Sequence, residues 1–269
     1  MRKKLKKKLN EDLKLIYKWL CANRLSLNVD KTEFIVFRPP RTILQHRFTL
    51  KLNRITLYES TKIKYLGLIL DKTLSWKHHI LELRKKLSRA VGILYKMKNN
   101  SCPQSILISL YHALFHSHLS YGICLYGLAD DIYTSKIALI QKRAIRIISS
   151  APFNAHTAPL FSELRILDFE NVLKLQLSLL MWDYDHGNLP IAFNDYFIKA
   201  KDVHKYNTRF SSKNKLSENI LVNTDSHGKK MLKFMGPRVL NDILDFDFYE
   251  ISKNKIQFKS KMKNHLLAK

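Results

Sequence analysis

The sequence has few cysteines, few acidic residues and no long apolar run, and each shortage excludes a class of protein. Its three cysteines, Cys21, Cys102 and Cys124, are odd in number and far apart, which indicates neither a disulfide framework nor a zinc knuckle. This usage favours a reducing compartment, so we expect a nuclear or cytoplasmic protein that is not secreted. No stretch reaches the roughly 18 consecutive apolar residues of a membrane-spanning helix, so we expect no membrane partner.

The shortage of acidic residues leaves the chain strongly basic. It has 22 Asp and Glu residues against 47 Lys and Arg residues, a formal net charge of +25. Because solubility requires only a modest net charge, this excess predicts a polyanionic partner, with nucleic acid favoured over an anionic membrane surface. Apolar residues are 46% of the 269 residues, which is enough to build a packed core.

Hydrophobic periodicity predicts a mostly helical chain with a small sheet near its start. Apolar residues recur at helical spacing over 9–20, over 75–98, up to residue 148, over 157–164, after Asp168 and over 256–266. Short apolar or alternating runs at 34–37, 48–52, 55–57 and 63–69 are typical of strands. The predicted fold class is therefore α+β, mostly α, with a small antiparallel sheet at about residues 34–70, followed by basic helices. Gly67 within the last strand indicates a bulge or a close backbone approach.

The helix over 75–98 carries the clearest sign of a binding surface. Its polar face has a single acid, Glu82, and the following basic residues: Lys77, Arg84, Lys85, Lys86, Arg89, Lys96 and Lys98. A solvated helix face normally mixes charges of both signs, so this face predicts contacts with phosphates. We select Lys77, Arg84, Lys85 and Arg89 as nucleic-acid-binding residues.

Two stretches resemble one protein family. L-S-L-N-V-D-K-T-E-F-I-V-F (residues 25–37) resembles the helix–strand segment that follows the catalytic residues in reverse transcriptases of non-LTR (LINE-like) retrotransposons. Y-L-G-L-I-L-D-K-T-L-S-W-K-H-H-I (residues 65–80) resembles the primer-grip hairpin that enters their thumb. The resemblance implies the C-terminal part of an RNA-directed DNA polymerase, whose catalytic half would precede Met1. We therefore expect a fragment that is inactive by itself.

The resemblance also implies a domain layout and partners. Residues 1–72 would be a partial palm with the primer-grip-like segment, 73–150 a thumb-like helical region and 151–269 a helical basic C-terminal region. Lys31 would lie near the incoming nucleotide and Gly67 at the primer, although a solvated lysine and a plain bulge are alternatives. The expected partners are an RNA–DNA or RNA duplex and the missing palm and fingers. No cofactor is expected in this chain, whereas the complete enzyme would use Mg²⁺.

The stretch Q-K-R-A-I-R-I-I (residues 141–148) is also typical of the C-terminal region of these elements. Its basic residues Lys142, Arg143 and Arg146 line one side of an apolar stripe. They either face phosphates or are solvated, and we retain them as candidate nucleic-acid contacts.

Two other motifs invite a catalytic or metal-binding interpretation. Asp130–Asp131 resembles the aromatic-x-Asp-Asp catalytic signature of the family, in which paired carboxylates hold two metal ions. It follows residues 25–37 instead of preceding them, lies between predicted helices, and has no earlier strand with a third carboxylate. We therefore interpret it as the N-cap and first turn of a helix. His112 and His116 have zinc-ligand spacing but no evident third ligand, so we predict packing roles, and no catalytic or metal-binding residue is assigned.

Two other functions remain open from the sequence. The first is a domesticated or unrelated basic nucleic-acid-binding module without a polymerase role. The second is a protein-interaction scaffold whose charge is incidental. A preference for RNA–DNA hybrids over single strands would favour the polymerase hypothesis.

Overall fold

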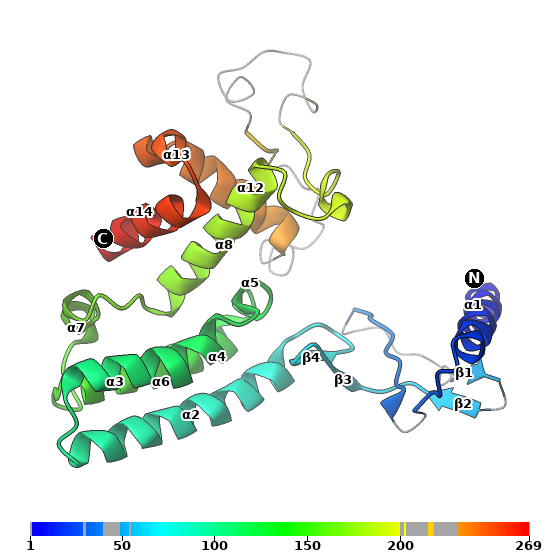
Figure 1. Ribbon diagram of the computed structural model, residues 1–269, viewed down its shortest axis with the longest axis horizontal. Coiled ribbons are helices and arrows are strands. Elements are labelled where there is room, and N and C mark those ends of the chain that lie inside the picture. Colours follow the sequence, from blue (N-terminus) through cyan, green and yellow to red (C-terminus); the bar gives the residue numbers. More distant parts are fainter. Residues whose placement is uncertain are drawn as a thin grey trace. The chain divides into compact units, whose positions relative to one another are not determined.

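The computed structural model describes residues 2–28, 31–39, 49–53, 55–199, 202, 215–217 and 231–268. They belong to two compact units, Met1–His79 and Ile80–Lys269. The described residues are 62% helical and include two small antiparallel two-stranded sheets, which confirms the predicted α+β, mostly α fold class (Figure 1). The boundary between the units lies close to the predicted one at residues 72 and 73, and the three-part division stays a prediction.

In the first unit, helix α1 (Arg2–Ala22) packs on a hairpin of β1 (Thr49–Leu52) and β2 (Ile55–Tyr58). The strands are antiparallel with Thr49 opposite Tyr58, so the hairpin expected from the alternating pattern is confirmed. The apolar side chains of the hairpin and one stripe of α1 form a small core. Its members are Leu50, Leu52 and Leu57, with Leu9, Leu13, Tyr17, Leu27, Phe34 and Ile55 around them.

The second hairpin consists of β3 (Lys62–Tyr65) and β4 (Leu68–Asp71). Tyr65 pairs with Leu68, which leaves a two-residue turn at Leu66–Gly67. Both turn residues have positive φ angles, 45° and 81°, as a type I′ hairpin turn requires. The predicted bulge at Gly67 is therefore wrong, because this glycine serves the turn and does not interrupt a strand.

The predicted strand at residues 34–37 is also wrong. Phe34 makes one isolated parallel bridge with Glu59, and residues 35–37 belong to no strand in the described part of the chain. The backbone instead continues to Arg38, whose N–H donates to the Lys72 carbonyl at 2.9 Å and whose side chain pairs with Glu59 at 3.0 Å. A single sheet was expected over 34–70. The structure instead has two separate hairpins within 49–71, because the strands of each hairpin form backbone hydrogen bonds only with each other.

The second unit begins with most of α2 (Lys77–Asn99), which confirms the helix expected over 75–98. Its buried residues recur three or four positions apart: Ile80, Leu83, Leu87, Ala90, Val91 and Leu94. A second helical segment then runs without a break through α3 (Gln104–Leu110), the π-helix η2 (Tyr111–His116) and α4 (Ser117–Ser120). It is followed by α5 (Ile123–Tyr126) and the long helix α6 (Asp131–Ile148).

Helix α8 (Phe169–Asp185) is the centre of the C-terminal helices (Figure 1). Its expected cap is confirmed, because the Asp168 side chain accepts a hydrogen bond from the Asn171 N–H at 2.8 Å. Helices α4, α5, α6, α12 (Leu232–Leu244) and α14 (Lys255–Leu267) contact α8. The Trp182 ring stacks on Phe258 of α14 at 4.4 Å between centroids. The other described elements are α7 (Thr157–Glu163), η3 (Ile191–Phe193) and α13 (Asp247–Ile251).

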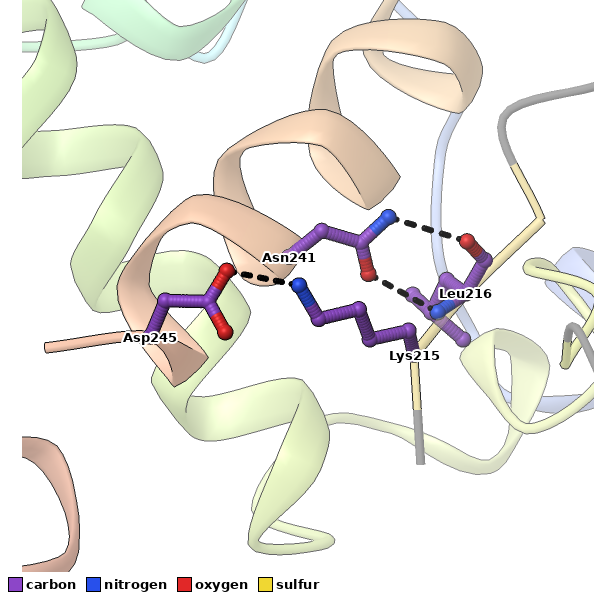
Figure 2. Close-up of polar contacts among 4 residues, drawn as sticks. All are labelled: Lys215, Leu216, Asn241 and Asp245. Carbon is purple, nitrogen blue, oxygen red and sulfur yellow. Dashed lines mark hydrogen bonds and ion pairs between the residues drawn. The ribbon is translucent and has the colours of Figure 1, made fainter. Parts of the chain in front are cut away.

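A buried asparagine on α12 fixes the short described segment 215–217 (Figure 2). Asn241 is 3% exposed. Its Oδ1 accepts from the Leu216 N–H at 2.9 Å and its Nδ2 donates to the Leu216 carbonyl at 3.0 Å. Beside this pair, Lys215 Nζ lies 2.6 Å from Asp245 Oδ2. One side chain therefore satisfies both backbone groups of Leu216.

Replacing Asn241 by aspartate is expected to lower the free energy of unfolding by about 1–3 kcal/mol. The carboxylate can accept from the Leu216 N–H but cannot donate to the Leu216 carbonyl, which then loses its partner in a buried site. Urea unfolding measures the change. Asn188→Asp makes the same chemical change at an exposed position and is the control. Equal stability of Asn241→Asp and wild type would contradict the role of the two hydrogen bonds between Asn241 and Leu216.

Candidate nucleic-acid interface

The start of α2 is fixed by a buried aspartate at the end of β4. The Asp71 carboxylate accepts four hydrogen bonds, from the Thr73 N–H and hydroxyl at 3.0 and 2.6 Å and from the Ser75 N–H and hydroxyl at 3.2 and 3.0 Å. Burial raises the pKa of this carboxyl, but the hydrogen bonds lower it by more, so the pKa lies below its usual value. Leu74 and Trp76 have positive φ angles of 51° and 61°. Asp71 thus holds a strained turn from which α2 begins.

The solvent-facing side of α2 is predominantly cationic. Its exposed basic residues are Lys77, Lys85, Lys86, Arg89 and Lys96. From Lys77 to Lys96 they extend about 28 Å along the helix axis at about 1.5 Å per residue. Successive phosphates of one DNA strand are about 3.4 Å apart along the duplex axis, so the face is long enough to meet several of them. We call this set of residues the α2 cationic face.

Two of the residues predicted to contact nucleic acid, Lys85 and Arg84, are not freely solvated side chains. Lys85 Nζ lies 2.7 Å from Glu82 Oε1, and both side chains are exposed, at 63% and 50%. An exposed pair of this kind contributes at most about 1 kcal/mol, so a phosphate can replace Glu82 as the partner of Lys85. Arg84 is half-buried at the edge of the face, and its Nε has no hydrogen-bond partner within the described residues.

Two further residues on this side of α2 were not assigned a role from the sequence. Tyr95 is 54% exposed and lies between Arg89 and Lys96 along the helix, where its ring is available for stacking. Gly92 is exposed, and a Cβ added there would meet no atom within 4 Å. A glycine inside a helix lowers stability by about 0.5–1 kcal/mol relative to alanine. Packing within the protein does not explain why residue 92 is glycine, because its added Cβ would meet no neighbouring atom.

The other predicted contacts lie in separate parts of the structure. Lys31 is exposed in a short turn, and its N–H donates to Asn28 Oδ1 at 3.1 Å. Gly67 is exposed at the tip of the β3–β4 hairpin. Both belong to the first unit, whereas Lys142, Arg143 and Arg146 lie on α6 in the second. The nucleic-acid contacts assigned to these residues stay predictions.

Within the α6 group the three basic residues have different environments. Lys142 and Arg143 are exposed. Arg146 Nε donates to the Ala155 carbonyl at 2.9 Å, and the guanidinium lies 5.9 Å from the centre of the Phe153 ring. Arg146 therefore already stabilises the turn after α6, while Lys142 and Arg143 remain available to a ligand.

The residues that resemble a catalytic carboxylate pair lie at the start of α6. Asp130 occupies the N-cap position of α6 and Asp131 its first turn, which confirms the interpretation made from the sequence. Among the described residues no group of three or more His, Cys, Asp or Glu side chains is arranged to hold a metal ion, so this pair does not fit a two-metal site. The three cysteines are unpaired. In the part of the chain that the structure covers, no helix is both long and apolar enough to cross a membrane.

The chain is similar to polymerases of mobile elements. It is 26% identical over 162 residues to the RNA-directed DNA polymerase from mobile element jockey of Drosophila funebris, which is 59% of this chain and 17% of that protein. Proteins of Drosophila melanogaster also match, and two of them come from other transposons. The probable RNA-directed DNA polymerase from transposon X-element is 26% identical over 38% of this chain and 12% of its own length. The corresponding protein from transposon BS is 22% identical over 62% of this chain and 21% of its own length.

These relatives are RNA-directed DNA polymerases of non-LTR retrotransposons, which confirms the resemblance seen in the sequence. The chain spans only 12–21% of the length of the curated relatives that it matches. No family model matches the chain, and no solved structure matches it.

Proposed function

We propose that this homologue of non-LTR retrotransposon polymerases is part of an RNA-directed DNA polymerase and that its role is to bind the template–primer duplex. The observation that carries the proposal is the α2 cationic face, a row of exposed basic side chains on one helix whose start is fixed by Asp71. The names of the relatives support the enzyme class, because an RNA-directed DNA polymerase acts on an RNA template and a DNA product.

The α2 cationic face binds phosphates and does not read bases. Lysine and arginine side chains that neutralise phosphates release condensed counterions, and this gain supplies affinity without sequence information. A polymerase must move along any template, so contacts of this type suit its thumb. The apolar stripe on the opposite side of α2 anchors the helix in its unit, so the cations are presented on a rigid element.

Phosphoryl transfer itself is not assigned to any residue of this chain. The resemblance implies Mg²⁺ in the complete enzyme. We do not assign its site to Asp130 and Asp131, because they lie at the N-cap position and in the first turn of α6, and the described residues form no metal-binding group there. We therefore expect the chain alone to bind nucleic acid without polymerising it, and the palm and fingers to be supplied by the remainder of the enzyme. A nuclear or cytoplasmic location follows from this partner.

Fluorescence anisotropy with three labelled ligands tests the proposal: an RNA–DNA hybrid, single-stranded RNA and single-stranded DNA of equal length. We expect the hybrid to bind most tightly, with an affinity that falls as salt rises. Equal affinity for all three ligands would indicate an unrelated basic module instead. Absence of binding to any of them at low salt would contradict the proposed function.

Replacing Gly92 by alanine is expected to have opposite effects on folding and on binding. The free energy of unfolding should rise by about 0.5–1 kcal/mol, because alanine is the better helix residue and nothing blocks its Cβ. Affinity for the hybrid should fall, because the methyl group stands between Arg89 and Lys96 on the surface that approaches the phosphates. Ser88→Ala, at an exposed neighbour, should leave affinity unchanged; tighter hybrid binding by Gly92→Ala would contradict a close approach at this point.

A further inference from the structure

The turn after α6 presents one aromatic ring to solvent. Phe153 is 86% exposed, the highest value for a large apolar side chain among the described residues. It is the second residue of the turn formed by residues 152–155, in which the Ala155 N–H donates to the Pro152 carbonyl at 3.1 Å. The ring therefore lies at the tip of a hydrogen-bonded turn.

Hydrogen bonds from α6 hold this turn in place on both sides of the ring. Before the ring, the Ala151 N–H donates to the Arg146 carbonyl at 2.9 Å. After it, Arg146 Nε donates to the Ala155 carbonyl at 2.9 Å. Ser150, where the chain leaves the helix, has a positive φ angle of 53°. Because the backbone on both sides is already fixed, a ligand that stacks on Phe153 has little backbone entropy to remove.

The surroundings of the ring are basic. The guanidinium of Arg146 lies 5.9 Å from the centre of the Phe153 ring. Lys142 and Arg143 are exposed one helical turn earlier, on the same side of α6 as Arg146. No ion pair among the described residues involves these three cations, and the sequence has no acidic residue over 132–162. Their charge is therefore available to an anionic ligand.

This combination matches the chemistry of an unpaired nucleotide. A single exposed apolar side chain is ordinary on a protein surface, but here a fixed aromatic ring lies beside cations. A nucleotide likewise joins a flat π-system to a phosphate, and bases of any sequence stack on aromatic side chains. Neighbouring bases cover both faces of a base inside a duplex, so only an unpaired base can stack on Phe153.

We propose that the turn after α6 is a stacking site for an unpaired nucleotide. The base lies on the Phe153 ring. The adjoining phosphates accept hydrogen bonds from the two Nη groups of Arg146 and from Lys142 and Arg143. The site rests on the proposed function, because it assumes that the partner is nucleic acid, and it adds a single-stranded segment to the duplex assigned to α2.

The position of the turn within the second unit suits this role. Only residues 100–103 separate α2 from α3. At the start of α3, Gln104 Nε2 donates at 3.4 Å to the carbonyl of Ile148, the last residue of α6. The end of α6 thus lies beside the segment that follows α2. We therefore expect a strand that leaves the duplex at the Asn99 end of α2 to pass Phe153.

Fluorescence anisotropy of the full chain with two ligands tests the site: a blunt RNA–DNA hybrid, and the same hybrid with a single-stranded RNA extension. We expect Phe153→Ala to weaken the extended hybrid about tenfold, through loss of stacking, and to leave the blunt hybrid unchanged. Phe153→Trp keeps an aromatic surface and should preserve binding of the extended hybrid. Phe153→Leu is apolar but not aromatic and should behave like the alanine variant.

A control and a direct readout complete the test. Ile191→Ala removes another apolar side chain, 85% exposed, and should change the affinity for neither ligand. A fluorescent adenine analogue in the extension should be quenched by the wild-type chain and not by Phe153→Ala. Thermal unfolding checks that each variant is folded.

The outcomes separate this site from the proposed function. Equal affinity of wild type and Phe153→Ala for the extended hybrid would overturn the stacking site and leave duplex binding by α2 intact. Equal losses for both ligands would also overturn it, because the ring would then serve the duplex. A lower mass of Phe153→Ala in sedimentation would assign the ring to a second copy of the chain instead. If the wild-type chain binds neither ligand, the proposed function fails and this site fails with it.

Discussion

Replacing Arg84, Lys85 and Arg89 together by alanine is expected to weaken binding of an RNA–DNA hybrid about 100-fold near 0.1 M salt, and to reduce the salt slope by about two to three. We expect each of these side chains to neutralise one phosphate, so three counterion releases are lost together. The fold should survive, because Lys85 and Arg89 are exposed and Arg84 is half-buried at the edge of the helix. Anisotropy titrations at several salt concentrations measure both quantities.

The control for this experiment removes the same charge elsewhere. Lys174, Arg238 and Lys253 are exposed on or beside other helices of the second unit, so their triple alanine variant has the same net charge as the α2 variant. We expect its hybrid affinity to remain within a few-fold of wild type. Equal losses in the two variants would mean that overall charge, and not the α2 cationic face, determines binding.

The second large effect is expected on stability. Replacing Asp71 by alanine removes the acceptor of four hydrogen bonds and leaves the Thr73 and Ser75 donors without their partner. We expect the free energy of unfolding of the first unit to fall by about 3 kcal/mol, because hydrogen bonds to a charged acceptor are worth about 1.5–3 kcal/mol each and are not additive. Denaturant unfolding followed by circular dichroism measures this loss. Asp12→Ala, at an exposed position of α1, should be nearly neutral.

The contribution of Asp71 should also depend on pH. The pKa of its carboxyl is lower in the folded chain than in the unfolded one, so the stabilisation is complete above the unfolded value of about 4 and is lost as the pH falls through the folded value. The stability difference between wild type and Asp71→Asn should therefore shrink between about pH 5 and pH 2. A difference that stays constant over this range would contradict the role of the ionised carboxylate.

Local sequence signals identified the helices and one hairpin correctly. The spacing of Leu83, Leu87 and Leu94 is long and regular, so only a helix can bury these residues together. The turn that begins α8 was predictable because Asp168 bonds to the backbone three residues ahead. In each case the deciding interaction lies within a few residues of the signal.

The failures have a different physical origin. The run 34–37 is as apolar as a strand, but strand formation requires a partner. Among the residues that the structure describes, only Phe34 of this run pairs with another segment, at Glu59. Gly67 was placed inside a strand because the period of the pattern does not fix the register; the observed pairing puts it in the turn. Tertiary pairing decides both positions, and no local pattern reports it.

The candidate nucleic-acid interface also has parts that the sequence could predict and parts that it could not. The α2 cationic face was predictable because all its residues lie on one helix. Asp71 was not singled out from the sequence, although the hydroxyl residues two and four positions after it are the signal that could have found it. The environment of Arg146 was not detectable, since its partners, the Ala155 carbonyl and the Phe153 ring, come within reach only through the turn after α6.

Photo-crosslinking of the wild-type chain to an RNA–DNA hybrid, followed by mass spectrometry of the crosslinked peptides, tests most directly whether α2 binds the duplex. We predict that the main crosslinks fall within residues 77–96 and disappear in the Arg84, Lys85 and Arg89 alanine variant. Crosslinks that persist in this variant, or that avoid α2 in the wild-type chain, would contradict binding of the duplex by the α2 cationic face.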